Sequence, residues 1–428
     1  MAGVPADART TARRGLLAAA GLALAGCASA PSPPPPPPPR PAPARPGAAA
    51  AAREQAAPLA EAAGRHARAD RANWTDAEHR VDAFSRLDEI FPANVSARPA
   101  EAQPWRRGRA PPAALSAIDD YLARNPVTGL ALARDDTLLV ERYRYGRRDT
   151  HRLTSFGMAR TLVAMLAGSA LEDRRLRSID DPAQTYASAL AGSAYGAVPL
   201  RDLLTMRSGL RLRDEETGGD DTARLTRATL GGPGAGGSPG PGAAQALRDH
   251  DRRIAEPGQR WAYSAGDCYV LALAVRGALR RPLSDYFSER IWKPIGAEAD
   301  ASWLVDRSGQ ELGYTGFNAV LRDWARLGML LARRGAVDSR QAIPAAWVRE
   351  ATRAQVGLRQ TGRGYGYGYQ TWVFADDDGS FALLGEHGQA MFVDPTRRLV
   401  MVNTAVGPAR ELGGSETVGL WRVLRRLA

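Results

Sequence analysis

The clearest pattern in the chain is a run of apolar residues with helical spacing. Met158, Leu162, Val163, Leu166 and Ala170 fall three or four positions apart, with one adjacent pair. We therefore expect a buried helix that is entered through a turn. The same kind of spacing predicts further helices over residues 74–91, 113–124, 261–277, 283–291, 318–334 and 417–427.

Strands are predicted on both sides of this helical region. Residues 129–134 and 137–143 are β-like and are separated by Asp135 and Asp136, which predicts a hairpin. The carboxyl-terminal third contains further predicted strands, at 366–374, 381–384, 389–393 and 399–404. Strands at both ends with helices between them predict an α+β fold, in which one antiparallel sheet is flanked by helices and carries a helical insertion.

Two segments of different composition precede the globular part. Residues 1–27 are predicted to be a lipoprotein signal peptide, and residues 28–70 a proline- and alanine-rich linker that includes seven consecutive prolines at 33–39. Such a proline tract favours a stiff polyproline helix. Residues 71–428 are predicted to be one domain, with a flexible glycine-rich loop at 230–243.

The first 27 residues have the features of an export signal. Arg13 and Arg14 precede the apolar run 16–25, which is too short to span a bilayer comfortably. The run ends in Leu-Ala-Gly-Cys at residues 24–27, which is similar to the bacterial lipobox. We expect lipidation of Cys27 and an exported protein anchored at the cell envelope, facing the periplasm or the cell surface. An ordinary signal peptide that happens to contain a cysteine is the alternative.

Composition indicates few other partners. The net charge of +11 comes almost wholly from arginine, because Lys293 is the single lysine. The arginines are scattered and no nucleic-acid-binding motif accompanies them, so we expect a solvated basic surface and no nucleic-acid partner. The five histidines lack ligand spacing, and after Cys27 only Cys268 remains. We therefore expect no metal, no cofactor and no disulfide framework.

Three short motifs occur in an order that is typical of one superfamily. They are Gly-Met-Ala-Arg at 157–160, Tyr-Ser-Ala-Gly-Asp at 263–267 and Glu-His-Gly-Gln at 386–389. Their order resembles that of the serine β-lactamase-related superfamily, which includes penicillin-binding proteins and class C β-lactamases, and most closely its branch of 6-aminohexanoate-dimer hydrolases. Leu-Leu-Thr-Met-Arg-Ser-Gly-Leu at 203–210 also matches a run that is common there. The resemblance covers roughly residues 85–428 and implies the β-lactamase/DD-peptidase fold.

The resemblance also implies site residues. In this superfamily a serine opens a Ser-x-x-Lys helix and attacks a carbonyl, while the lysine one turn later helps to remove its proton. Tyr263 corresponds to the tyrosine that shares in proton transfer. Glu386, His387, Gly388 and Gln389 correspond to a strand-edge motif that aligns substrate, in which Gln389 is expected to offer a backbone N–H to the oxyanion.

The first motif departs from the family at both of its chemical positions. Gly157 has no side chain that could attack, and Arg160 stays protonated in proteins, so it cannot act as a base. Ser155 lies two residues early, which displaces it from the nucleophile position in either a strand or a helix. We therefore predict a pseudoenzyme. An active amide or ester hydrolase with a relocated nucleophile is the alternative.

The same departure leaves two possibilities for binding. With Tyr263 and His387, the Arg160 guanidinium would suit a small molecule or peptide with a carboxylate, such as the end of a cell-wall peptide. Glu386 would instead close the pocket if it paired with Arg160, and such a pair would argue against ligand binding. The distance between Arg160 and Glu386 distinguishes these two arrangements.

Overall fold

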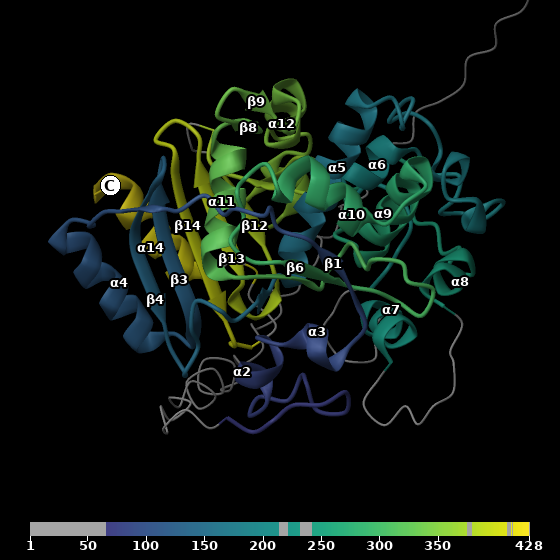
Figure 1. Ribbon diagram of the computed structural model, residues 1–428. Helices are drawn as coiled ribbons and strands as arrows, with labels where there is room; N and C mark the ends of the chain where they lie inside the picture. The colour runs from purple at the N-terminus through teal and green to yellow at the C-terminus, as the bar shows by residue number, and fades with distance from the viewer. Residues whose placement is uncertain are drawn as a thin grey trace, which may run out of the picture. The chain divides into compact units, whose positions relative to one another are not determined.

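The computed structural model describes residues 66–213, 221–231, 242–374, 379–408, 412 and 414–427. The predicted signal peptide, nearly all of the predicted linker and most of the glycine-rich loop lie outside these residues. Within the described residues, the main sheet has eight strands in the order β10-β11-β12-β13-β14-β3-β4-β2 (Figure 1). Neighbours pair antiparallel except β2 and β4. The strands are β2 (Arg106–Arg107), β3 (Val127–Arg134), β4 (Thr137–Tyr143), β10 (Gly366–Tyr367), β11 (Trp372–Val373), β12 (Phe381–Leu384), β13 (Ala390–Asp394) and β14 (Leu399–Ala405).

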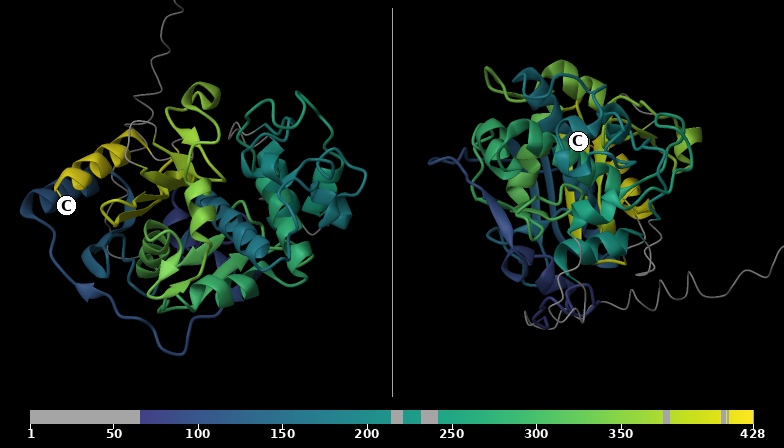
Figure 2. Two further views of the ribbon diagram at one scale, coloured as in Figure 1. Left: turned by 90° about the horizontal axis from the view of Figure 1, so that it is seen from above. Right: turned by 90° about the vertical axis from the view of Figure 1, so that its right-hand side faces the viewer.

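Helices cover both faces of the main sheet. Successive residues of a strand point to opposite faces, so neighbouring residues of β13 contact different helices. In β13, Met391 lies against Gly328 of α11 (Leu321–Ala332). The next residue, Phe392, stacks on Trp421 of α14 (Ser415–Leu427), with 5.6 Å between ring centroids. Helix α14 packs in turn on α4 (Pro112–Arg124), and Figures 1 and 2 show this pair on the outer side of the sheet.

A group of helices lies beside the sheet, as the three views in Figures 1 and 2 agree. At its centre α5 (Ala159–Glu172) packs against α9 (Ala265–Leu279). The group includes α6 (Leu200–Leu204), α7 (Asp221–Leu230), α8 (Ala243–Arg248) and α10 (Leu283–Phe287), and α12 (Ala345–Ala351) and α13 (Leu358–Thr361) follow later in the chain. These helices follow the β3–β4 hairpin and precede β10, so the predicted α+β arrangement with a helical insertion is confirmed.

A second sheet has the order β1-β6-β7-β5. Its strands are β1 (Ala93–Ser96), β6 (Ala301–Leu304), β7 (Phe317–Ala319) and β5 (Leu153–Thr154), and a separate two-stranded sheet pairs β8 (Ala336–Val337) with β9 (Arg340–Gln341). Strand β5 leads directly into the predicted site. The second sheet therefore fixes the approach of the chain to Gly157.

Two predicted helices were wrong in detail. Asn318 was expected to begin a helix, but it lies in β7, between its partners Thr154 of β5 and Ser302 of β6, and α11 begins at Leu321. Pairing on both edges overrides the helical pattern there. The segment 74–91 forms two short helices, α2 (Arg80–Ala83) and α3 (Leu87–Ile90), instead of one.

The break between α2 and α3 has a physical reason. The carbonyl of Phe84 accepts a hydrogen bond from the Thr154 amide at 3.0 Å, just before the predicted site. A continuous helix would direct that carbonyl along its own axis. The amino-terminal segment is thus tied to the strand that enters the site.

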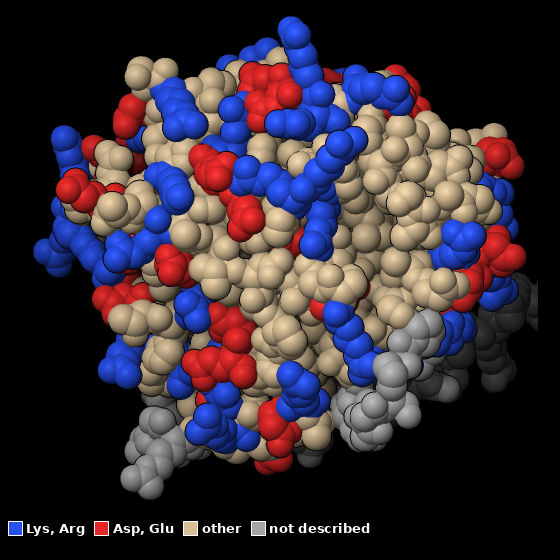
Figure 3. All heavy atoms as spheres, turned by 45° about the vertical axis from the view of Figure 1, so that its right-hand side comes forward, with Lys and Arg blue, Asp and Glu red and all other residues tan. Residues whose placement is uncertain are grey.

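The described surface mixes both signs of charge. On the face in Figure 3, blue Lys and Arg side chains are interspersed with red Asp and Glu side chains. Among the described residues, none of the helices has both the length and the apolar content that crossing a bilayer requires. In the same part of the chain, His, Cys, Asp and Glu form no group of three or more that could hold a metal ion.

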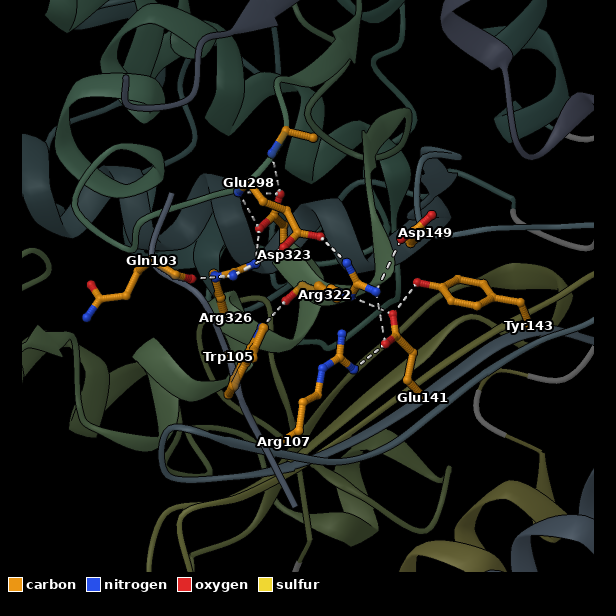
Figure 4. Close-up of polar contacts among 11 residues, drawn as sticks. Gln103, Trp105, Arg107, Glu141, Tyr143, Asp149, Glu298, Arg322, Asp323 and Arg326 are labelled. Carbon is orange, nitrogen blue, oxygen red and sulfur yellow. Dashed lines mark hydrogen bonds and ion pairs between the residues drawn. The ribbon is translucent and has the colours of Figure 1, made fainter. Parts of the chain in front are cut away.

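An ion-pair network ties the segment 97–111, which contains β2 and is called the arm here, to the rest of the domain (Figure 4). Arg322, in the first turn of α11, bridges Glu141 of β4 at 2.7 Å and Glu298 at 3.2 Å. Arg107, in the arm, pairs with the same Glu141 at 2.6 Å. Arg322 therefore joins α11 to β4 and to the segment that contains Glu298, and Glu141 connects this group to Arg107 of the arm.

Candidate active site

The site begins at a strained turn after β5. Phe156 has φ of 43°, a left-handed conformation that is unusual for a bulky residue. Its ring packs against Phe84 and His387, each with 4.8 Å between centroids. This packing holds the turn that presents Gly157 at the start of the short helix η1 (Phe156–Met158), from which α5 continues.

Gly157 lies between the end of β12 and Tyr263. A Cβ atom at this position would lie 2.8 Å from the Leu384 carbonyl oxygen and 3.3 Å from both the Gly385 Cα and the Tyr263 hydroxyl oxygen. The first distance is shorter than a carbon–oxygen contact allows. The position therefore has the neighbours expected of a nucleophile site, but it lacks the room for a side chain.

A carboxylate of the protein accepts the hydrogen bond of the backbone N–H at the site. The Gly157 amide donates a hydrogen bond to Glu386 Oε2 at 2.9 Å. In serine hydrolases of many folds, backbone N–H groups of this kind stabilise the oxyanion that forms during acyl transfer. Here the amide already has an anionic acceptor from the protein itself.

Arg160 lies one turn after Gly157 and is only 2% exposed. Its guanidinium pairs with Glu386 Oε1 at 3.4 Å, and its carbon lies 4.2 Å from the centroid of the Tyr263 ring. Its Nε also donates to the Tyr314 carbonyl at 3.4 Å. The contact between Arg160 and Glu386 is thus the arrangement that argues against an open carboxylate pocket.

Tyr263 stands immediately before α9 and is 8% exposed. The exposed Arg363 places its guanidinium 5.7 Å from the same ring that Arg160 contacts. Ser264 caps α9 by accepting a hydrogen bond from the Asp267 amide at 3.1 Å, which fixes the segment that carries Tyr263. The structure therefore brings Gly157, Arg160, Tyr263 and Glu386 together.

The other three residues of the Glu-His-Gly-Gln motif make contacts within the fold. His387 is 6% exposed, and its Nδ1 bonds the Gly407 carbonyl at 2.8 Å. Burial lowers the pKa of His387 to about 4. The carbonyl of Gly388 accepts a hydrogen bond from the Asn403 amide group at 2.8 Å.

Gln389 is likewise held internally. Its side chain exchanges two hydrogen bonds with the backbone of Ala405, and its own N–H, expected to face an oxyanion, donates to the Glu386 carbonyl at 3.3 Å. In this conformation, Glu386 is the residue of its motif that contacts Gly157.

The sequence analysis did not predict a buried group of hydrogen-bonded polar side chains around Asp267. Asp267 is completely buried and accepts hydrogen bonds from the Ser208 hydroxyl at 2.8 Å and the Tyr195 hydroxyl at 3.2 Å. Burial raises the pKa of Asp267 to about 7, while the hydrogen bonds oppose that rise. Ser208 and Asp267 stand in two of the quoted motifs, so the signal was present, but only the fold shows that they meet.

The residues considered for a relocated nucleophile or base are Ser155, Lys293 and Tyr263. Ser155 is fully buried, and its hydroxyl donates to the Phe156 carbonyl and accepts from the Phe317 amide. Lys293 is exposed at the end of η4 (Ser288–Trp292). The hydroxyl that lies beside position 157 is that of Tyr263.

Comparison with known proteins decides the family. Residues 116–411 match the family model described as Beta-lactamase. The chain belongs to the β-lactamase family. The predicted superfamily and the predicted fold are therefore confirmed.

Two of the relatives of this β-lactamase-family protein carry the name of the expected branch. The 6-aminohexanoate-dimer hydrolase of Paenarthrobacter ureafaciens is 24% identical over 371 residues, which cover 78% of this chain and 88% of the relative. A candidate 6-aminohexanoate-dimer hydrolase from Bacillus anthracis has a similar structure, with a TM-score of 0.73 and 22% identity, over 83% of this chain and 95% of the other. A penicillin-binding protein homologue from Caulobacter crescentus gives a TM-score of 0.57 and 16% identity, over 73% and 97% of the two chains.

Proposed function

We propose that this β-lactamase-family chain is a pseudoenzyme that is held at the cell envelope as a lipoprotein. The observation that carries the proposal is the contact between Gly157 and Glu386, in which a carboxylate takes the backbone donor beside a position that has no nucleophile. The anchor is proposed from the lipobox-like run that ends at Cys27.

The site lacks a nucleophile and a base for acyl transfer, and its backbone N–H at residue 157 is already bonded to Glu386. Gly157 supplies no nucleophile, and the guanidinium of Arg160 cannot accept a proton at physiological pH. In serine proteases, removal of the nucleophile lowers kcat by about 10⁶ and loss of one oxyanion-hole donor by about 10² to 10³. The Glu386 carboxylate would in addition repel a negative charge that developed next to the Gly157 amide.

A hydrolase with a relocated nucleophile is the second candidate. It is favoured by the hydroxyl of Tyr263, which lies 3.3 Å from where a Cβ of residue 157 would be, and by the hydrolase name of the 24% identical relative. Against it, Arg160 lies over the Tyr263 ring and is a permanent acid, so it cannot activate the hydroxyl as a base.

The partners follow from this proposal. A lipid on Cys27 would attach the protein to a membrane, and the linker would hold the body away from it. The body would then meet small molecules or peptides of the envelope, and we propose no nucleic-acid partner. Such a protein acts by binding, since it lacks the groups for turnover.

Hydrolysis assays on the purified chain test the proposal. The substrates are p-nitrophenyl acetate, nitrocefin and the linear dimer of 6-aminohexanoate, and intact mass is recorded after exposure to penicillin G and to a fluorophosphonate. Tyr263→Phe is the matched control, because it removes the remaining hydroxyl at the site. We expect equal background rates and no adduct in both proteins. Turnover that disappears in Tyr263→Phe, or an adduct on Tyr263 or within 154–161, would refute the pseudoenzyme.

A further inference from the structure

A cavity separate from the Gly157 site lies between the arm, the β3–β4 turn and the carboxyl-terminal half of α11. Its volume is about 320 Å³, which is within the range of sites that hold small molecules. The described residues that line it fall in 103–106, 135–136, 295 and 326–338, so none of them belongs to the three motifs. The cavity is therefore a candidate for a second binding site.

Hydrogen bonds fix the wall that the arm contributes (Figure 4). The Gln103 amide donates to the Gly296 carbonyl at 2.9 Å, and the Gln103 carbonyl accepts from the Arg326 guanidinium. The indole N–H of Trp105 donates to the Arg322 carbonyl at 3.3 Å. Because these bonds hold the arm against α11, the cavity is already formed before a ligand enters it.

One part of the lining is apolar. The Trp105 ring is half-buried, and the Arg326 guanidinium lies 5.5 Å from its centroid. Beside it are the buried side chains of Ile295, Met329 and Leu330. An indole face and aliphatic side chains together suit an aromatic or a large aliphatic group of a ligand.

The other part of the lining is charged, and most of its charges are already neutralised. The ion pairs that involve lining residues are Arg106–Asp136, Asp135–Arg398 and Arg326–Asp323. Arg333, at the end of α11, and Asp338, after β8, differ from these. Within the described part of the chain, neither side chain makes an ion pair or a hydrogen bond. One cation and one anion therefore remain for a ligand.

We propose that this cavity binds a free α-amino acid with a large apolar side chain. Its carboxylate pairs with Arg333, its ammonium group pairs with Asp338, and its side chain lies against Trp105. A ligand with a single charge would leave either Arg333 or Asp338 without a counterion. The cavity shares no residue with the Gly157 site, so this inference holds whether or not the chain hydrolyses a substrate.

Calorimetric titration of the full chain tests the class of ligand. The probes are L-phenylalanine, L-tryptophan and L-leucine, each up to about 10 mM, and we expect saturable binding of at least one of them. For L-phenylalanine, three matched compounds each lack one feature. They are 3-phenylpropionate without the ammonium group, L-phenylalaninamide without the carboxylate, and L-alanine without the ring. Each should bind at least about tenfold more weakly, because a lost charged hydrogen bond or apolar contact costs at least about 1.4 kcal/mol.

Substitutions assign the binding to the cavity. Arg333→Gln and Asp338→Asn remove the two charges, and each should weaken binding of the same amino acid at least about tenfold. Both should fold, since Arg333 is partly exposed and Asp338 is exposed, and asparagine tolerates the φ of 48° at 338. Arg334→Gln is the matched control, because this exposed neighbour does not line the cavity.

The proposal has clear contrary outcomes. It is overturned if none of the three amino acids binds, or if 3-phenylpropionate binds as well as L-phenylalanine. It is also overturned if Arg333→Gln and Asp338→Asn bind as tightly as Arg334→Gln, because the ligand would then lie elsewhere. Tyr263→Phe should bind the amino acid as the wild-type chain does, which separates this cavity from the Gly157 site. Since no turnover is measured, the outcome is independent of the hydrolysis assays.

Discussion

Arg160 and Glu386 depend on each other at the level of single residues. A guanidinium that is 2% exposed requires an anion nearby, and Glu386 supplies it from a segment far away in the sequence. Glycine at 157 is required by space as well, because the end of β12 lies where a Cβ would be. Loss of the nucleophile and closure of the site are thus one arrangement.

Restoring the Ser-x-x-Lys motif should not restore activity. Gly157→Ser combined with Arg160→Lys places a side chain against the Leu384 carbonyl oxygen and leaves Glu386 on the residue-157 amide. We expect no gain in p-nitrophenyl acetate hydrolysis over the wild-type chain, and a loss of about 1 to 3 kcal/mol in unfolding free energy from overpacking. The unmodified chain, assayed in parallel, is the reference. Esterase activity in the double variant would show that the rest of the site is open and competent.

His387 should make stability depend on pH. Burial lowers its pKa from 6.5 in the unfolded chain to about 4 in the fold. The unfolded state therefore binds the proton first as pH falls. The contribution of neutral His387 to the free energy of unfolding is complete above about pH 7 and is lost as pH falls through 4. The expected loss in unfolding free energy is about 3 kcal/mol, which follows from about 1.4 kcal/mol per pKa unit.

Urea unfolding between pH 7.5 and 4 measures this contribution. His387→Asn removes the titrating group, and asparagine tolerates the left-handed backbone at this position, where φ is 62°. The variant should lose less stability on acidification than the wild-type chain, by roughly the amount above. His250→Asn, which replaces a half-buried imidazole that bonds the Arg211 carbonyl, is the reference histidine variant. Identical slopes for wild type and His387→Asn would contradict the assignment.

The residues of the site were predictable, but their contacts were not. Gly157, Arg160, Tyr263 and Glu386 were found because motif order survives in the sequence, and the structure brings all four together. His387 and Gln389 belong to the same motif, yet they bond within the fold. A motif specifies where the chain passes, whereas the direction of each side chain depends on neighbours such as Phe84, which no local pattern links to the site.

At the level of elements, local patterns predicted those that bury one clear face. The β3–β4 hairpin, the buried helix α5 and the strands β12, β13 and β14 lie close to their predicted positions, whereas the predicted strand at 366–374 is divided into the paired short strands β10 and β11. The pattern was wrong at Asn318, where pairing on two sides makes a strand out of helix-like residues. Such contacts join distant segments and leave no trace in local spacing.

The ion-pair network around Arg322 should stabilise the junction of the arm, β4 and α11. Arg322→Met leaves Glu141 and Glu298 without their shared cation, and both carboxylates are largely buried, with side chains 11% and 24% exposed. We expect a loss of about 1.5 to 3 kcal/mol in urea unfolding followed by tryptophan fluorescence, because Arg107 and Arg326 still pair with these carboxylates. Arg353→Ala breaks the more exposed pair with Glu350 and should cost less than about 1 kcal/mol. Equal losses in the two variants would mean that the network adds nothing beyond a surface pair.

At the scale of the whole molecule, the proposed anchor determines where the closed site can act. The proline tract at 33–39 lies between the proposed anchor at Cys27 and the body of the protein. A body at the end of such a spacer reaches ligands that lie beyond the membrane surface. Anchoring and binding are therefore parts of one proposal, and the anchor can be tested separately.

Cys27→Ser should release the protein from the membrane. The chain has two cysteines, and Cys27 is the proposed site of lipidation. A lipid with more than one acyl chain at this position would attach the protein stably to the membrane. In the native host we expect wild-type protein in the membrane fraction and Cys27→Ser in the soluble fraction, with mass analysis of the amino-terminal peptide showing the lipid on wild type alone. Cys268→Ala is the control, because that thiol is buried in the body and should not affect attachment. Wild-type protein without lipid in the soluble fraction would indicate an ordinary signal peptide, and membrane retention of Cys27→Ser without lipid would indicate that another part of the chain holds the protein there.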